Sequence, residues 1–350
     1  MLFHLLLALA AVIIVGRLLG PIFRAIGQPP VIGEVIAGIA LGPSLLGRVA
    51  PEVYRYILPP DIAPLLGSVA QLGVVTYMFL VGLELNPWEA RRHLRSTVST
   101  AVGAVVLPFA MGSLLAFHLY PRFSAPEVPF ANFALFVGVA MSITAFPVLA
   151  RILSDTGMSR RPIGVHALTC AAVNDIGAWC LLAVIVGVVH VTSSSVLVVG
   201  AFLVGAAIPH DSRLARALGG RFERLVIVAL LPAFFAFTGM RTEIHLVSGW
   251  PEWTAVALII AVATAGKFGG ALLGARVAGL DWRTAAALGV LMNTRGLMEL
   301  IVLNMGLDLG LISPQLYTMM VLMALATTVA TTPALQLVLG QPRSRAVAAV

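Results

Sequence analysis

Eleven segments of this chain are apolar and long enough to lie in a lipid bilayer, and this pattern constrains the fold most strongly. They cover residues 2–20, 30–47, 63–84, 97–119, 131–153, 163–190, 196–209, 223–240, 252–275, 283–306 and 314–340. A spanning helix needs about 20 apolar residues, so segments 30–47 and 196–209 are short. Only 11% of the residues are charged, against about 25% in a soluble domain. The sequence therefore predicts an all-α polytopic membrane protein with about 11 spans.

Arginine in the connections predicts how these spans are oriented. With the N-terminus outside, sixteen arginines fall on the inner side and only four, Arg48, Arg55, Arg122 and Arg241, on the outer side. The positive-inside rule then places both the C-terminus and the arginine-rich connections in the cytoplasm. We therefore interpret the net charge of +7 as a topology signal and expect no nucleic-acid partner. The predicted location is the cell inner (plasma) membrane, as a multi-pass protein in contact with lipid.

The two halves of the chain resemble each other. Gly33 and Gly38 match Gly200 and Gly205, Gly82 matches Gly239, and the run 138–141 matches the run 289–292. The predicted topology orients the matching segments in opposite directions, which indicates the inverted-topology repeat of many secondary transporters. We expect a first repeat at 1–190, a short linker at 191–199 and a second repeat at 200–350.

Two matching segments interrupt their apolar runs at corresponding places. Segment 131–153 contains Ser142, Thr144 and Pro147, and segment 283–306 contains Asn293, Thr294, Arg295, Gly296 and Glu299. Such residues unwind a helix and free backbone groups, which lipid tolerates only where the backbone is buried or lines a cavity. Two unwound helices in corresponding positions of two repeats indicate an ion site near the middle of the membrane.

Asp175 is the aspartate that lies deep within an apolar span, and Asn174 precedes it. A carboxylate there can bind either a proton or a dehydrated sodium or potassium ion, and competition between the two is sufficient for antiport. We therefore expect Asp175 to be the metal ligand, with Asn174 and Thr144 as auxiliary ligands. A structural aspartate that caps a helix break is the alternative.

Lys267 is the single lysine and also lies at mid-depth of its span, where a lone ammonium is costly unless it has a partner. We predict that Lys267 pairs with Asp175 when no cation is bound; the alternative is that it binds carbonyls at the break in segment 283–306. Arg295 and Glu299 are four residues apart on one helical face and are expected to pair. With Asn293, Pro147 and Ser142, they are interpreted as stabilising the crossover of the two breaks.

These motifs together resemble the monovalent cation:proton antiporter-2 family. The matching stretches include GEVIAGIALGPSLLG (33–47), SITAFPVLARIL (142–153), AAVNDIGAW (171–179), GKFGGALLGAR (266–276) and NTRGLMELIVLNMGL (293–307). The resemblance implies a sodium/proton antiporter-like fold and a homodimer with a dimerisation domain and a mobile core that moves like an elevator. It places the ion-binding acid at Asp175, its neighbour at Asn174, the crossover at Thr144 and the basic partner at Lys267.

One departure from the family concerns the linker. Relatives carry about 13 spans, with about two more helices where residues 191–199 join the halves here.

The predicted function is exchange of protons for sodium or potassium, without a cofactor. A cation channel or uniporter, or a transport-inactive scaffold, remains as an alternative. An intramembrane aspartyl protease is disfavoured because that chemistry needs two carboxylates that share a site.

Overall fold

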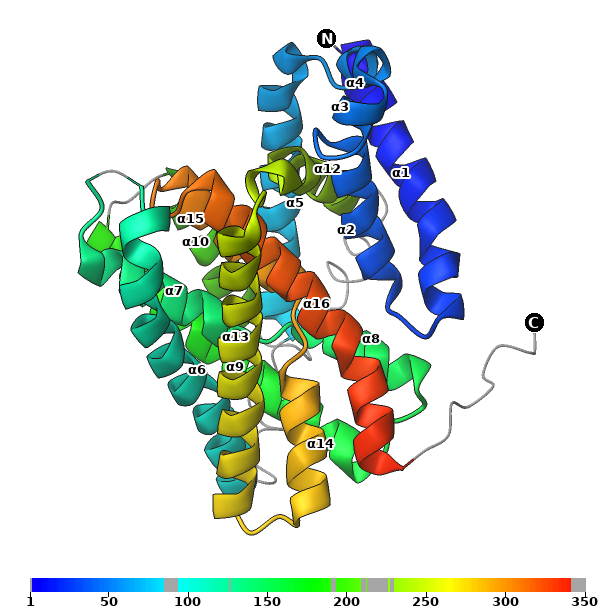
Figure 1. The fold of residues 1–350 in the computed structure, drawn as a ribbon. Helices are drawn as coiled ribbons and strands as arrows, with labels where there is room; N and C mark the ends of the chain where they lie inside the picture. Colours follow the sequence, from blue (N-terminus) through cyan, green and yellow to red (C-terminus); the bar gives the residue numbers. More distant parts are fainter. Residues whose placement is uncertain are drawn as a thin grey trace. The chain divides into compact units, whose positions relative to one another are not determined.

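The computed structural model is built from helices (Figure 1). It describes residues 2–84, 94–125, 127–189, 193–208 and 230–340, together with Ser212 and Val226. The α-helices are α1 (Leu2–Ala25), α2 (Pro30–Leu41), α3 (Leu46–Val49), α4 (Pro51–Ile57), α5 (Ala63–Glu84), α6 (Leu94–Phe123), α7 (Phe130–Ser142), α8 (Phe146–Asp155), α9 (Pro162–Val189), α10 (Ser193–Ala207), α12 (Leu231–Arg241), α13 (Trp250–Val277), α14 (Trp282–Met292), α15 (Leu297–Asp308) and α16 (Pro314–Leu339).

Each predicted apolar segment is largely helical where the structure describes it, but the count of eleven spans is not confirmed. Among the described residues, eight helical stretches are long and apolar enough to cross a membrane, and the bent pair α14–α15 makes nine. Helix α10 is too short to count among them and contributes the shorter apolar stretch 197–207. Segment 223–240 is represented by α12 from Leu231 onward; of its earlier residues, only Val226 and Leu230 are described.

Part of the predicted linker 191–199 is helical. Residues 193–199 already belong to α10, while 191 and 192 lie outside the described residues. The chain forms two compact units, each of which draws on both predicted repeats. Unit 1 comprises Met1–Arg24, Pro30–Asn86 and Val186–Val247; unit 2 comprises Ala25–Pro29, Pro87–Ile185 and Ser248–Val350. The division into repeats at 190 and 200 stays a prediction.

Within unit 1, one glycine-mediated contact occurs twice. A Cβ atom on Gly38 of α2 would collide with the backbone of Phe235 in α12, and one on Gly205 of α10 would collide with the backbone of Phe79 in α5. Gly38 matches Gly205 in the sequence repeat, and α5 matches α12. Each contact therefore joins a helix of one half to a helix of the other, and the repeat relates the two contacts to each other, with small residues that let backbones approach closely.

Within unit 2, α6 and α13 pack through a reciprocal contact. A Cβ on Gly103 would collide with the Gly270 carbonyl, and a Cβ on Gly270 would collide with the Gly103 carbonyl. A two-fold axis that relates two equivalent helices produces paired contacts of this kind. The close approach brings Ala104 of α6 beside Lys267 of α13, whose ammonium donates to the Ala104 carbonyl at 2.9 Å.

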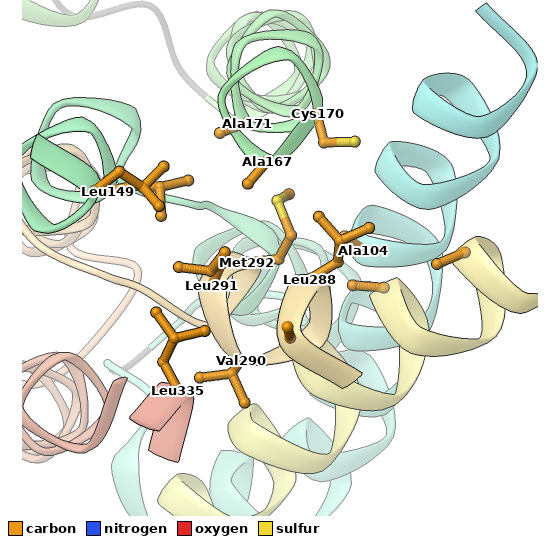
Figure 2. Close-up of a cluster of buried hydrophobic side chains, with 14 of the residues drawn as sticks. Ala104, Leu149, Ala167, Cys170, Ala171, Leu288, Val290, Leu291, Met292 and Leu335 are labelled. Atoms are coloured by element: carbon orange, nitrogen blue, oxygen red, sulfur yellow. The ribbon is translucent and has the colours of Figure 1, made fainter. Parts of the chain in front are cut away.

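An apolar cluster next to these helices holds α9 in place (Figure 2). Its buried members include Ala167, Cys170 and Ala171 of α9, and Leu288, Leu291 and Met292 of α14, with Ala104, Leu149 and Leu335 from other helices. Ala171 lies one helical turn before Asp175. The packing therefore places the predicted ion-binding acid one turn from residues that contact the end of α14.

Candidate functional site

Two broken helices cross at the centre of the candidate site. Helix α7 ends at Ser142 and α8 begins at Phe146, while α14 ends at Met292 and α15 begins at Leu297. The α14–α15 pair is bent by 46° at its break. The two non-helical stretches meet through a hydrogen bond from the Ala145 amide to the Thr294 carbonyl at 3.0 Å. The prediction of two discontinuous crossing helices is confirmed.

The residues at the first break explain its geometry. Pro147 lies in the first turn of α8, where its missing N–H leaves no helical hydrogen bond unmade. In a continuous helix a proline ring clashes with the carbonyl of the residue four positions earlier, and that residue, Ile143, has extended backbone here, with φ −73° and ψ 140°. The first break is therefore encoded largely by Pro147.

Each broken helix supplies a side chain to the last turn of the other. The Thr144 hydroxyl donates to the Met292 carbonyl of α14 at 3.2 Å. In the opposite direction, Arg295 donates from Nη2 to the Met141 carbonyl of α7 at 2.7 Å. These carbonyls lie at helix C-termini, where no amide of the same helix is available to them. The crossover is thus fixed by two equivalent contacts, one neutral and one cationic.

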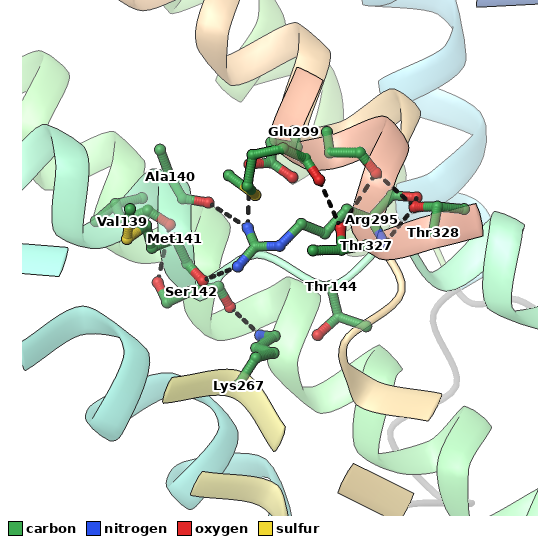
Figure 3. Close-up of polar contacts among 12 residues, drawn as sticks. Val139, Ala140, Met141, Ser142, Thr144, Lys267, Arg295, Glu299, Thr327 and Thr328 are labelled. Atoms are coloured by element: carbon green, nitrogen blue, oxygen red, sulfur yellow. Dashed lines mark hydrogen bonds and ion pairs between the residues drawn. The ribbon is translucent and has the colours of Figure 1, made fainter. Parts of the chain in front are cut away.

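Arg295 is the centre of a buried polar network (Figure 3). Its Nη1 donates to Glu299 Oε1 at 3.0 Å and to the Ala140 carbonyl at 3.2 Å. Both side chains of the Arg295–Glu299 pair are 0% exposed, so the ion pair compensates two charges that are costly to bury alone. The predicted pairing of Arg295 with Glu299 is present, and it connects α15 to the end of α7.

Lys267 binds backbone carbonyls. Its ammonium donates to the carbonyls of Ala104 and Ser142, and the ion pairs of the described residues contain none between Lys267 and Asp175. Neither the predicted pair nor the alternative contact with the break in segment 283–306 is among the direct contacts of Lys267 in the described residues, and pairing with Asp175 stays a prediction. The last turn of α7 presents free carbonyls and the negative end of the helix dipole, which attract a cation.

Asn174 joins this arrangement from α9. With its amide oriented so that both groups have partners, Asn174 donates to the Ser142 carbonyl at 3.2 Å and accepts from Lys267 Nζ at 3.2 Å. That orientation is chosen from the hydrogen-bond pattern. Asn174 therefore binds the same carbonyl and the same ammonium that end α7.

Asp175, the next residue of α9, is 2% exposed, and its Oδ1 has no hydrogen-bond partner in the described part of the chain. Buried polar atoms are nearly always paired, so a carboxylate oxygen in this state is a strong candidate for a ligand atom. Its neighbours on the sequence place it beside the crossover: Asn174 contacts Ser142, and Ala171 packs in the cluster that contains Met292.

The other predicted site residues contribute in smaller ways. Ser142 offers its carbonyl to the site, while its hydroxyl donates to Val139 of the same helix at 2.9 Å. Asn293 caps α14, and its buried Oδ1 has no partner among the described residues. Sequence reasoning missed Thr328 of α16, which exchanges hydrogen bonds with the backbone of Arg295. No group of three or more His, Cys, Asp or Glu side chains suited to a metal ion occurs in the described ranges.

Comparison with known proteins gives a consistent result. The family model "Sodium/hydrogen exchanger, transmembrane" matches residues 10–200 and 195–339. The chain is 40% identical to the Na(+)/H(+) antiporter NhaS4 of Synechocystis sp., with 94% of this chain and 96% of that protein covered. It is 31% identical to K(+)/H(+) antiporter 1 of Saccharomyces cerevisiae, covering 90% of this chain but only 44% of the longer yeast protein.

Two further findings concern length and fold. The NhaS4 alignment runs over 394 residues although this chain has 350, and the two parts of the family match meet at residues 195–200, where the sequence predicts a shortened join. The solved structure of the sodium proton antiporter MjNhaP1 from Methanocaldococcus jannaschii has the same fold, with a TM-score of 0.69 at 12% identity over 96% of this chain and 99% of that chain. The family match and the similarity to NhaS4 over nearly both full lengths show that the chain belongs to the sodium/hydrogen exchanger family.

Proposed function

We propose that this protein exchanges protons for sodium or potassium ions and that Asp175 binds both in turn. The observation that carries this proposal is the buried Asp175 Oδ1 without a hydrogen-bond partner, on a helix that contacts the crossover of two broken helices. The family of the chain and its similarity to a Na(+)/H(+) antiporter and a K(+)/H(+) antiporter support proton-coupled exchange of monovalent cations.

Antiport requires one group that can bind either a proton or an alkali cation, but not both at once. When Asp175 is ionised, its oxygens can bind an alkali cation; when it is protonated, the site loses its charge and the cation leaves. Further oxygen atoms lie at the end of α14. There the Thr144 hydroxyl donates to the Met292 carbonyl, and the Thr294 hydroxyl donates to the Leu291 carbonyl. Oxygen ligands of this kind suit hard cations.

Lys267 has a different role from the one its sequence position suggested. The carbonyl end of α7 receives two cationic side chains, Lys267 at Ser142 and Arg295 at Met141. These charges neutralise the negative end of the α7 dipole. The negative end of α14 receives neutral hydroxyls, so it remains able to attract a transported cation towards Asp175.

We further propose that exchange uses elevator-like alternating access in a homodimer within the plasma membrane. The resemblance of the motifs supports this, as does the inverted repeat, which is typical of alternating-access transporters. The predicted orientation has the N-terminus outside and the C-terminus in the cytoplasm. The excess of inner arginines supports it.

Reconstituted vesicles test the proposal. Vesicles that contain the purified protein and a trapped pH dye are given a sodium or potassium pulse, and the wild type is expected to alkalinise an acidic lumen. Asp175→Asn, which keeps shape but removes the charge, should abolish the signal, while Asp281→Asn at the exposed start of α14 should not. Cation flux without proton movement would indicate a channel, and no exchange with any alkali cation would indicate a transport-inactive scaffold.

A further inference from the structure

We propose that Thr328 of α16 is a positioning residue that clamps the unwound backbone at Arg295 and thereby sets the cation affinity of the site. The proposal rests on the proposed function, because cation affinity is defined only for a site that binds cations. The clamp itself is a statement about backbone geometry and can be tested separately.

The Thr328 hydroxyl binds both polar groups of one residue. Its oxygen accepts from the Arg295 amide at 3.0 Å, and its hydrogen reaches the Arg295 carbonyl, with an O–O distance of 2.6 Å. Arg295 lies in the break between α14 and α15, where no helical ladder provides these partners. Thr328 is 2% exposed, so water does not readily replace the lost bonds if the hydroxyl is removed.

The neighbouring threonines Thr327 and Thr331 make a different contact. The hydroxyls of Thr327 and Thr331 donate to carbonyls of their own helix, Met323 at 2.9 Å and Thr327 at 3.0 Å respectively. Threonine in a spanning helix commonly bonds to the preceding turn in this way. Thr328 also lies 2.8 Å from its own-helix carbonyl at Ala324, so its single hydrogen is shared between α16 and the crossover.

The clamped residue is the one that connects the two broken helices. The Arg295 side chain reaches the Ala140 and Met141 carbonyls, next to Ser142, whose carbonyl binds Lys267. On the other side of the clamp, the Thr294 carbonyl accepts from the Ala145 amide, adjacent to Thr144. A shift of the Arg295 backbone would therefore move the ends of both half-helices that border Asp175.

Three variants isolate the hydroxyl of Thr328. Thr328→Val replaces it with a methyl group of similar shape, Thr328→Ser restores it, and Thr331→Val removes an equally buried hydroxyl that bonds only within α16. Hydrogen–deuterium exchange of peptides that cover residues 291–298 reports on the clamp. The apparent KM for sodium and the maximal rate, measured in vesicles, report on the site.

We expect Thr328→Val to speed exchange in this segment about tenfold and to raise the apparent KM about tenfold, because the two hydrogen bonds to the Arg295 backbone are lost. The maximal rate should stay within about twofold, and Thr328→Ser and Thr331→Val should resemble the wild type. If Thr328→Val does not fold, Thr328→Cys, a weaker donor, should show a smaller change in the same direction.

Several results would overturn the proposal. Equal deuterium exchange in Thr328→Val and Thr331→Val would refute the clamp. Faster exchange with an unchanged KM, or failure of serine to restore the KM, would refute the effect on affinity. If the wild type transports no cation, the proposed function fails and with it the effect on affinity, while the deuterium-exchange comparison still decides the clamp.

Discussion

The packing of α6 against α13 predicts opposite effects for two adjacent glycine substitutions. A Cβ on Gly270 would lie within collision distance of the Gly103 carbonyl oxygen, 2.9 Å from its carbon and 3.1 Å from Leu107 Cβ. A Cβ on Gly269 would meet only Leu107 Cδ2, at an ordinary 3.5 Å. Gly270→Ala therefore forces two backbones apart, whereas Gly269→Ala does not.

The expected magnitudes follow from these contacts. Overpacking costs about 1–3 kcal/mol, and we take the upper end because a backbone atom cannot rotate away. Alanine gains up to about 1 kcal/mol over glycine in helix propensity. Gly270→Ala should thus lose about 2 kcal/mol of unfolding free energy, while Gly269→Ala should be neutral or gain up to about 1 kcal/mol.

Reversible unfolding in mixed detergent micelles, followed by circular dichroism, measures both variants against the wild type. The two substitutions change the same helix by the same methyl group, so differences in expression or detergent binding largely cancel. Equal stability of Gly270→Ala and Gly269→Ala would refute the reciprocal glycine contact and the close approach that places Lys267 beside Ala104.

Two further predictions concern charged residues. Lys267→Met leaves two buried carbonyls without a donor and should lower the unfolding free energy by about 2–4 kcal/mol in the same assay. An unchanged unfolding free energy in this variant would contradict the contacts of Lys267 with the Ala104 and Ser142 carbonyls. At the start of α14, hydrogen bonds from the Thr284 side chain and from the Thr284 amide hold the pKa of Asp281 below its usual range. The contribution of Asp281 to the free energy of unfolding is therefore present above the pKa of the unfolded chain, about 3.9, and is lost as pH falls through the lower pKa of the folded protein. Asp281→Asn should therefore reduce the loss of thermal stability below about pH 4. The same loss of thermal stability in the variant and the wild type would contradict this.

The sequence predicted the features that carry a side-chain signal. Pro147 and the polar run from Asn293 to Gly296 disfavour continuous helix in the middle of an apolar span, so both breaks could be located to within a few residues. Arg295 and Glu299 are spaced to meet on one helical face, and they do. Of the matching glycines that predicted the repeat, Gly38, Gly82, Gly205 and Gly239 make close backbone contacts that a Cβ atom would disturb.

The partners of Lys267 and Thr328 could not be predicted for a shared reason. Both bind backbone groups, at Ala104 and Ser142 in one case and at Arg295 in the other, and a carbonyl leaves no mark in the sequence. Pairing Lys267 with Asp175 followed from charge alone. Thr328 looks the same in the sequence as Thr331, which bonds only within its helix; only the fold distinguishes them.

The most direct test of the account is the dependence of cation affinity on proton concentration. If one carboxylate, Asp175, binds either a proton or a cation, acidifying the vesicle medium should raise the apparent KM for sodium or potassium in proportion to proton concentration, up to about tenfold per pH unit, at an unchanged maximal rate. An apparent KM that does not change across the acidic range, with active transport throughout, would show that protons and cations bind at separate groups and would contradict the account.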